Sequence, residues 1–278
     1  MGKWKAVVIA IGLAVMLVGC GARESEQGAV GASSLAGEVS EAAQTSWSGF
    51  SPTSATVSRS QRFGSVYSAA LGKLSEAKEL KSIVGAMKNA KQIPGMLDVA
   101  NPEYDVVLTD KNGGKRELHL WLGTLKGKDG MYMFVSDTGT GYKIDSEDAD
   151  DLRELIGKIE YSSEQAIANG EIVQSIRGLA NTDRWLDFVK SVGEGKSAEV
   201  HIVTYSIEGD PIFQDLLFEN GTIVYTTDTT MDKFGVPERT RSFCKGIDNA
   251  KSEQGTKYTL NQCDEPVHFE FDIPMEND

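Results

Sequence analysis

The chain has 278 residues, with 28 lysines and arginines against 41 aspartates and glutamates, which gives a formal net charge of −13. This acidity excludes nucleic acid as a partner, because phosphates require a basic surface. It also disfavours tight electrostatic binding to anionic lipids or anionic wall polymers unless divalent cations intervene.

The first nineteen residues have the pattern of a secretory signal peptide. Lys3 and Lys5 form a positive n-region, and an unbroken apolar run extends from Ala6 to Val18. At about 1.5 Å per residue this run makes roughly 20 Å of helix, which is shorter than the roughly 30 Å hydrocarbon core of a bilayer. We therefore expect residues 1–19 to be cleaved, and a signal-anchor helix is the alternative.

The run ends in Leu17-Val18-Gly19-Cys20, which resembles the bacterial lipobox. The resemblance implies that Cys20 becomes the first mature residue and carries a diacylglyceryl thioether. Each buried methylene contributes about 0.8 kcal/mol, so two or three acyl chains, palmitate among them, would hold the protein at the membrane surface. We expect a lipid-anchored protein on the extracytoplasmic face of the cell membrane, with a net charge of −15 because the cleaved segment carries two lysines and no acid.

Residues 20–54 are rich in Ser, Ala, Gly, Glu and Thr and poor in aliphatic side chains. Such a segment cannot bury enough apolar surface to fold, so a flexible tether is predicted. The remaining chain is long enough for two small α+β domains, over residues 55–160 and 166–272. We expect each to be an antiparallel sheet with one or two packed helices.

The first domain is predicted to contain two helices and two hairpins. The first helix is expected between an N-cap at Ser75 and a stop at Pro94-Gly95, and the second is expected to begin at Ser146. The apolar faces of these helices comprise Leu80, Ile83, Val84 and Met87 in the first, and Leu152, Leu155, Ile156 and Ile159 in the second. Between them, "YDVVLTD" and "KRELHLWLG" predict one hairpin, and "MYMFVSD" and "GYKID" predict another with its turn at Thr138 to Gly141.

The second domain is predicted to begin with a helix around "NTDRWLDFVKSV", which ends at Gly193. Three strands follow, "AEVHIVTYSI", "PIFQDLLFE" and "TIVYTTD". Asn220-Gly221 between the last two is a strong signal for a type I′ hairpin turn. A further strand pair near "TRSFCKGI" and "KYTLNQC" is expected to carry a disulfide between Cys244 and Cys263, because an extracytoplasmic compartment is oxidising.

These segments resemble two known families. Residues of about 55 to 159, with "DVANPEYDVVL", "LHLWLG" and "SDTGTGYKI", are similar to the YhfM-like domain of lipoproteins from spore-forming Gram-positive bacteria. Residues of about 166 to 265, with "YSIEGDPI", "TIVYTTDTTMDKFG" and both cysteines, resemble a domain of unknown function, family number 4362. The resemblance implies fold, export and lipid anchoring, and transfers no catalytic residue.

Motifs for catalysis are absent from the sequence. No Gly-x-Ser-x-Gly elbow occurs, and the two Ser-x-x-Lys matches lack their partner motifs. His119 and His201 each sit alone on a predicted strand, where a histidine is most often structural. No cofactor is therefore expected, apart from a Ca²⁺ ion considered next.

Four acidic residues are expected to gather at one end of the second domain's sheet. With Asn220-Gly221 as a two-residue turn, Asp228 falls opposite Phe213, and Glu208, Asp210 and Asp232 lie nearby. Oxygen ligands on loops suit Ca²⁺, while local capping of backbone N–H groups is the alternative.

Two functions fit these observations. The first is a lipid-tethered, non-catalytic binding or accessory module that engages a protein, a peptide or a wall fragment. The second is an envelope hydrolase whose site is assembled from dispersed residues such as Asp210, Asp228 and Tyr225. A pocket with convergent, pKa-perturbed carboxylates would favour the hydrolase.

Overall fold

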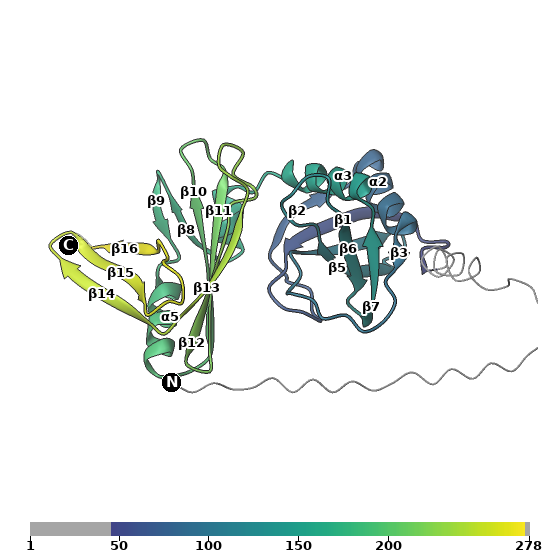
Figure 1. Ribbon diagram of the computed structural model, residues 1–278. Helices are drawn as coiled ribbons and strands as arrows, with labels where there is room; N and C mark the ends of the chain where they lie inside the picture. The colour runs from purple at the N-terminus through teal and green to yellow at the C-terminus, as the bar shows by residue number, and fades with distance from the viewer. Residues whose placement is uncertain (1–45, 276–278) are drawn as a thin grey trace, which may run out of the picture.

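The computed structural model describes residues 46–275, and Figure 1 shows how its elements are arranged. The predicted signal peptide, the lipidation residue Cys20 and the tether up to residue 45 lie outside the described residues. Within residues 46–275, no helix is both long enough and apolar enough to cross a membrane.

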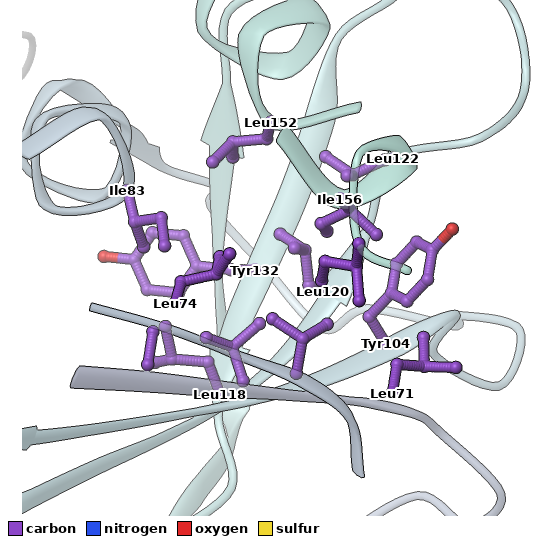
Figure 2. Packing of buried hydrophobic residues seen from close by; sticks show 14 of the residues in the cluster. Leu71, Leu74, Ile83, Tyr104, Leu118, Leu120, Leu122, Tyr132, Leu152 and Ile156 are labelled. Carbon is purple, nitrogen blue, oxygen red and sulfur yellow. The ribbon is translucent and has the colours of Figure 1, made fainter. Parts of the chain in front are cut away.

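The N-terminal domain is built on one seven-stranded antiparallel sheet, with the strand order β2-β1-β4-β5-β6-β7-β3. Its strands are β1 (Pro52–Arg59), β2 (Ala70–Leu74), β3 (Lys91–Gln92), β4 (Tyr104–Asp110), β5 (Lys115–Trp121), β6 (Gly130–Phe134) and β7 (Asp137–Ile144). Helices α2 (Ala77–Asn89) and α3 (Ser146–Gly157) cover one face of this sheet (Figure 1). Leucine, isoleucine and tyrosine side chains from both layers fill the space between them (Figure 2).

This domain begins earlier than the sequence suggested. The sequence predicts that Trp47 belongs to the tether, yet its side chain is fully buried, and its Nε1 donates a hydrogen bond to the Tyr132 hydroxyl at 3.1 Å. Phe50 packs edge-on against Trp47, and β1 starts at Pro52. The tether therefore ends before Trp47, because two aromatic side chains in a polar stretch bury enough surface to dock on the sheet.

Both predicted helices form, with shifted ends. Helix α2 has Glu76 rather than Ser75 at its N-cap, and the Glu79 carboxylate accepts the Glu76 backbone N–H at 3.2 Å, as in a capping box. It ends at Asn89, before the expected stop, because Lys91–Gln92 pairs with β7 as a short strand. Helix α3 has Asp145 at its N-cap, one residue before the predicted Ser146.

The second hairpin of this domain turns elsewhere than predicted. Phe134 pairs with Asp137, so the turn consists of Val135 and Ser136, and the predicted turn at Thr138 to Gly141 lies within β7. A Cβ atom at Gly141 would collide with the Leu97 side chain. This glycine therefore permits close packing, and its presence misled the turn prediction.

The C-terminal domain contains a six-stranded sheet with the order β13-β12-β11-β10-β8-β9 and a three-stranded sheet with the order β14-β15-β16. The strands are β8 (Ile172–Ser175), β9 (Gly178–Ala180), β10 (Ala198–Tyr205), β11 (Pro211–Glu219), β12 (Thr222–Asp228), β13 (Arg239–Cys244), β14 (Gly246–Ser252), β15 (Gly255–Asn261) and β16 (Glu270–Pro274). The helices are α4 (Ser163–Ala168) and α5 (Asp183–Gly193). The predicted α+β class with mostly antiparallel sheets is confirmed.

One strand pair is parallel. Strand β8 runs parallel to β10, because the chain crosses over through α5 between them. Neither β8 nor β9 is predicted from the sequence. In the described residues the domain extends from α4 to the end of β16, slightly beyond both predicted limits.

The β11–β12 hairpin has the predicted register. Glu219 pairs with Thr222 and Phe213 with Asp228, and the two turn residues have positive φ angles of 51° at Asn220 and 73° at Gly221. These angles are those of a type I′ turn, for which the Asn-Gly sequence is suited.

Cys244 and Cys263 form a disulfide, which is the pairing expected from the sequence. The strands around it pair differently from the expectation. "TRSFC" belongs to β13 and pairs with β12, whereas Gly246 begins β14 and pairs with Asn261 of β15. The disulfide therefore links the edge of the six-stranded sheet to the segment that follows β15.

The two faces of the six-stranded sheet belong to different cores. One face packs with α5 and the three-stranded sheet, around Trp185 and Phe271. The opposite face turns toward the N-terminal domain (Figure 1), and its Phe213 belongs to the same apolar cluster as the N-terminal core. The domains therefore share one apolar cluster across their contact.

Candidate functional site

Three cross-strand rows of residues occupy the face of the six-stranded sheet that turns toward the N-terminal domain. We define the docked row as Val203, Phe213, Asp228 and Arg239, the polar row as His201, Asp215, Thr226 and Arg241, and the outer row as Glu199, Leu217, Val224 and Phe243. Side chains alternate between the two faces along a strand, so all three rows share one face.

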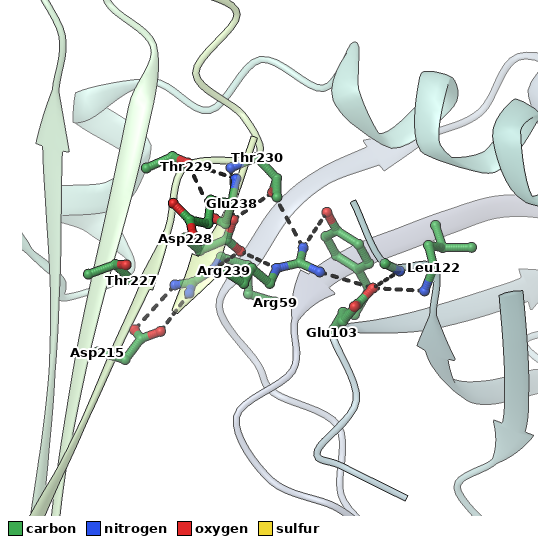
Figure 3. A network of polar contacts seen from close by, with 12 residues as sticks. Arg59, Glu103, Leu122, Asp215, Thr227, Asp228, Thr229, Thr230, Glu238 and Arg239 are labelled. Carbon is green, nitrogen blue, oxygen red and sulfur yellow. Dashed lines mark hydrogen bonds and ion pairs between the residues drawn. The ribbon is translucent and has the colours of Figure 1, made fainter. Parts of the chain in front are cut away.

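Arg59, at the end of β1, crosses from the N-terminal domain to this face (Figure 3). Its guanidinium donates two hydrogen bonds to Asp215, at 3.2 and 2.5 Å, and its Nε lies 3.7 Å from the Asp228 carboxylate. The same guanidinium stacks over the Phe213 ring at 4.1 Å from the centroid. Arg59 is thus a bidentate, almost fully buried connection between the domains.

Arg239, in β13, makes the reciprocal connection (Figure 3). Its Nε donates to Asp228 at 2.8 Å, while its other nitrogens lie 2.9 Å from the Glu103 carboxylate and 2.7 Å from the Tyr104 hydroxyl. Glu103 also accepts the backbone N–H groups of Leu122 and Gly123. Two arginines therefore join carboxylates of both domains into one network.

The network keeps its buried carboxylates ionised. Burial disfavours the charge on Asp215, but Arg59 and His201 outweigh it and hold the pKa of Asp215 well below its ordinary value. Burial acts in the same direction on Asp228, and Arg239 and Arg59 outweigh it, so the pKa of Asp228 is also lowered. Neither group can act as a proton donor near neutral pH.

A cleft of about 310 Å³ opens beside this network and is lined by both domains. Its N-terminal wall is formed by residues 59–61 and 100–103, and its C-terminal wall by the polar row and parts of the other two rows. The volume lies at the lower end of the range typical for small-ligand sites.

Four buried side-chain atoms of residues that line this cleft have no hydrogen-bond partner among residues 46–275. Arg59 Nε and Arg239 Nη1 still lie 3.7 Å and 2.9 Å from carboxylates, which leaves Ser60 Oγ and His201 Nε2 with neither a hydrogen bond nor an ion pair. His201 Nδ1 lies 2.8 Å from Asp215 Oδ1, and an ionised carboxylate can only accept, so Nδ1 carries the proton. In the neutral imidazole, Nε2 is therefore a vacant acceptor.

The N-terminal domain contains a second histidine in the same setting. His119 and Asp105 are cross-strand neighbours with the same Nδ1 to Oδ1 distance of 2.8 Å, as His201 and Asp215 are. There the segment after β1 covers the pair, and Gly64 N–H donates to His119 Nε2 at 2.8 Å. His119 has the structural role expected of a strand histidine, whereas His201 lacks the matching donor.

The structure gives the predicted calcium site no support. Asp228 pairs with arginines, Asp210 lies 3.3 Å from Lys233 Nζ, and Asp232 accepts the backbone N–H groups of residues 234 and 235. Glu208 is exposed. Among the described residues, no three or more His, Cys, Asp or Glu side chains are grouped so that they could hold a metal ion. Three of the four predicted ligands, Asp210, Asp228 and Asp232, instead form ion pairs with basic side chains or accept hydrogen bonds from backbone N–H groups.

The residues suggested for a hydrolase are not brought together either. Tyr225 lies in the core beside α5, on the opposite face of the sheet from Asp228. Burial and the negative charge of Asp215 raise the pKa of Tyr225 to about 12. Asp210 does not line the cleft.

One buried carboxylate with a raised pKa lies behind the cleft lining, close enough to Arg59, His201 and Asp215 to interact with their charges. Glu171 accepts a hydrogen bond from the Tyr161 hydroxyl, and burial raises its pKa. Tyr205 donates in turn to the Tyr161 backbone carbonyl at 3.1 Å. This cluster stabilises the connection between the domains, and its carboxylate does not line the cleft.

Sequence reasoning missed the interdomain role of Arg59 and Arg239. The sequence places His119 and His201 on predicted strands, and the spacing of 14 residues between each histidine and its aspartate, 105 to 119 and 201 to 215, is a further signal. The ion pairs that Arg59 and Arg239 form with the other domain could not be predicted from the sequence of one domain alone.

The fold and the cleft define a two-domain α+β protein joined by buried arginine–carboxylate contacts. Residues 60–161 match the family model of the YhfM protein, and residues 169–259 match the domain of unknown function DUF4362. The N-terminal domain thus matches the YhfM family model and the C-terminal domain matches the DUF4362 model, which are the two families that the sequence resembles.

Comparison with solved structures adds no functional argument. The crystal structure of a thioesterase-like protein from Clostridium sporogenes ATCC 15579 shares 19% sequence identity with the chain, at a TM-score of 0.31. The match covers 37% of this chain and 93% of that protein. A comparison with curated proteins finds no match.

Proposed function

We propose that the protein is a lipid-anchored, non-catalytic binding module of the cell envelope, and that its ligand occupies the cleft between the domains. Cys20 would carry the lipid and hold the protein on the extracytoplasmic face of the membrane. The bound ligand, a small molecule or part of a wall fragment or peptide, would contact both domains at once.

The observation that carries this proposal is the pairing of the cleft's carboxylates. Asp215, Asp228 and Glu103 each contact Arg59 or Arg239, and Glu199 is paired with Arg62 at 2.8 Å. Acid–base catalysis by carboxylates needs a protonated carboxyl group as the acid, whereas the pKa values of Asp215 and Asp228, the two buried carboxylates of the cleft lining with shifted pKa values, are both lowered. The arrangement favours a rigid binding surface over a carboxylate-based hydrolase.

The position at which the folded domain begins supports a lipid anchor that is separated from the cleft by a tether. Because Trp47 is already part of the core, residues 20–45 would separate the lipid from the domain. A flexible coil of this length has a root-mean-square reach of roughly 28 Å. The cleft would then stand clear of the lipid headgroups.

Two measurements test the proposal. A photo-crosslinking amino acid at Gln61, in the cleft, should capture a ligand on intact cells, while the same group at the exposed Glu253 should not. Metabolic labelling with palmitate should mark the wild type and not Cys20→Ser. Equal capture at both positions would refute the cleft as the binding site, and unlabelled wild type would refute the anchor.

A further inference from the structure

We propose that the cleft binds a small hydroxylated carboxylic acid, such as a sugar acid. Its hydroxyl groups would contact His201 Nε2 and Ser60 Oγ, and its carboxylate would contact Arg241. This inference deepens the proposed function, on which it rests, by naming the chemical class of the ligand.

The chemistry at His201 follows from the comparison with His119. Both histidines are fixed by an aspartate on Nδ1, so both offer Nε2 as an acceptor when the imidazole is neutral. The fold supplies the Gly64 N–H to His119 Nε2 and supplies no donor to His201 Nε2 among residues 46–275. A ligand with an O–H or N–H group completes the second site in the way that Gly64 completes the first.

Ser60 is compatible with a hydroxyl group on the ligand. Ser60 lines the same cleft, and its buried Oγ lacks a hydrogen-bond partner within the described chain. A serine hydroxyl both donates and accepts, and a ligand hydroxyl does the same, so hydroxyl groups can satisfy both orphan atoms. Leaving such atoms unsatisfied carries a desolvation penalty, which a ligand or ordered water must offset.

The carboxylate of the proposed ligand is inferred from Arg241. It lies in the polar row with His201, directly across from Thr226, and lines the cleft. Arg59 and Arg239 each contact two carboxylates, but within residues 46–275 the side chain of Arg241 makes no ion pair or hydrogen bond. An exposed arginine free to form a bidentate contact suits a carboxylate.

The distance between His201 and Arg241 in the polar row sets the span that the ligand must bridge. His201 and Arg241 are three strands apart, which is roughly 14 Å between backbones, and the long arginine side chain can reduce that span. Next to the polar row, the half-buried Leu217 and Val224 of the outer row also line the cleft. They offer an apolar surface to the C–H face of a sugar ring, while the polar row takes its hydroxyls.

The test is calorimetric titration of the full chain, purified in a polyoxyethylene detergent that carries no sugar, at about pH 8, where an ordinary histidine is neutral. D-Glucuronate is the probe. D-Glucose lacks the carboxylate, and glutarate lacks the hydroxyls. We expect saturable binding of D-glucuronate below about 20 mM and affinities at least about tenfold weaker for the other two compounds, the loss of one charge-assisted contact.

Variants assign the contacts. Ser60→Ala, His201→Gln and Arg241→Gln should each weaken D-glucuronate binding by about tenfold. Arg177→Gln removes an exposed arginine paired with Glu164, outside the cleft, and should bind like the wild type. Ser60→Ala and Arg241→Gln remove no side-chain hydrogen bond or ion pair within the described fold, so they keep the test valid if His201→Gln is unstable.

The outcomes are distinct. No saturable heat with D-glucuronate, equal affinity for D-glucose or glutarate, or wild-type affinity in the cleft variants would each overturn the assignment. Ordered water alone would then satisfy the two orphan atoms. Capture by the crosslinker at Gln61 in the absence of D-glucuronate binding would leave the proposed function standing and reject only this ligand class.

Discussion

Replacing Arg59 with methionine tests how strongly the buried network holds the protein together. Methionine keeps much of the aliphatic stem that lies over Phe213 but removes the charge. Asp215 then loses two hydrogen bonds, and Asp228 loses its longer ion pair while keeping Arg239. The side chains of Arg59, Asp215 and Asp228 are only 10%, 13% and 5% exposed, so little solvent screens the loss.

Removing one partner of a buried ion pair typically costs about 3–5 kcal/mol. Asp215 retains its contact with His201, which places the expected loss at the lower end, about 3 kcal/mol of unfolding free energy. In an Asp215→Asn background the same Arg59→Met change should cost only about 1 kcal/mol, because the unpaired charge is gone.

Urea unfolding of the full chain in nonionic detergent, followed by tryptophan fluorescence at neutral pH, measures both values. Small-angle scattering on each variant shows whether the domains separate before they unfold. A cost below about 1 kcal/mol for Arg59→Met in the wild-type background would refute the reasoning, since that is the size of an exposed pair.

Three further predictions concern the core, the disulfide and pH. Trp47→Ala should lower the unfolding free energy by about 3–5 kcal/mol in the same urea assay, and a neutral result would return residue 47 to the tether. Replacing Cys244 and Cys263 together with serine should cost about 3 kcal/mol under oxidising conditions, and adding dithiothreitol to the wild type should reproduce that loss; an unaltered midpoint in both cases would contradict it. Because the pKa values of Asp215 and Asp228 are lowered by folding, their stabilisation is present above the ordinary pKa of about 4 and is lost as the pH falls below it. Melting temperatures measured between about pH 7 and pH 2 should fall as this stabilisation is lost. In Arg59→Met the melting temperature should fall less steeply with decreasing pH than in the wild type.

Local signals predicted much of the fold. The Asn220-Gly221 turn fixed the β11–β12 register, because few dipeptides tolerate two consecutive positive φ angles. The α5 boundary at Gly193 and the apolar faces of α2 and α3 also followed from periodicity. These features depend on residues close together in the chain.

Features set by distant residues escaped prediction. Trp47 docks against Tyr132, 85 residues away, and a side chain at Gly141 would meet Leu97, a residue 44 positions earlier in the chain. Arg59 and Asp215 are separated by 156 residues, so no local pattern could pair them. The acidic cluster was misread for the same reason, because a carboxylate's charge partner is visible only in the folded chain.

The shared apolar cluster has a consequence for how each half could exist alone. Phe213, Met231 and Val203 come from the DUF4362 half, yet they complete the cluster of the YhfM half. Either half on its own would expose this apolar contact surface to water. It would therefore need polar residues at these positions or another subunit that covers the surface.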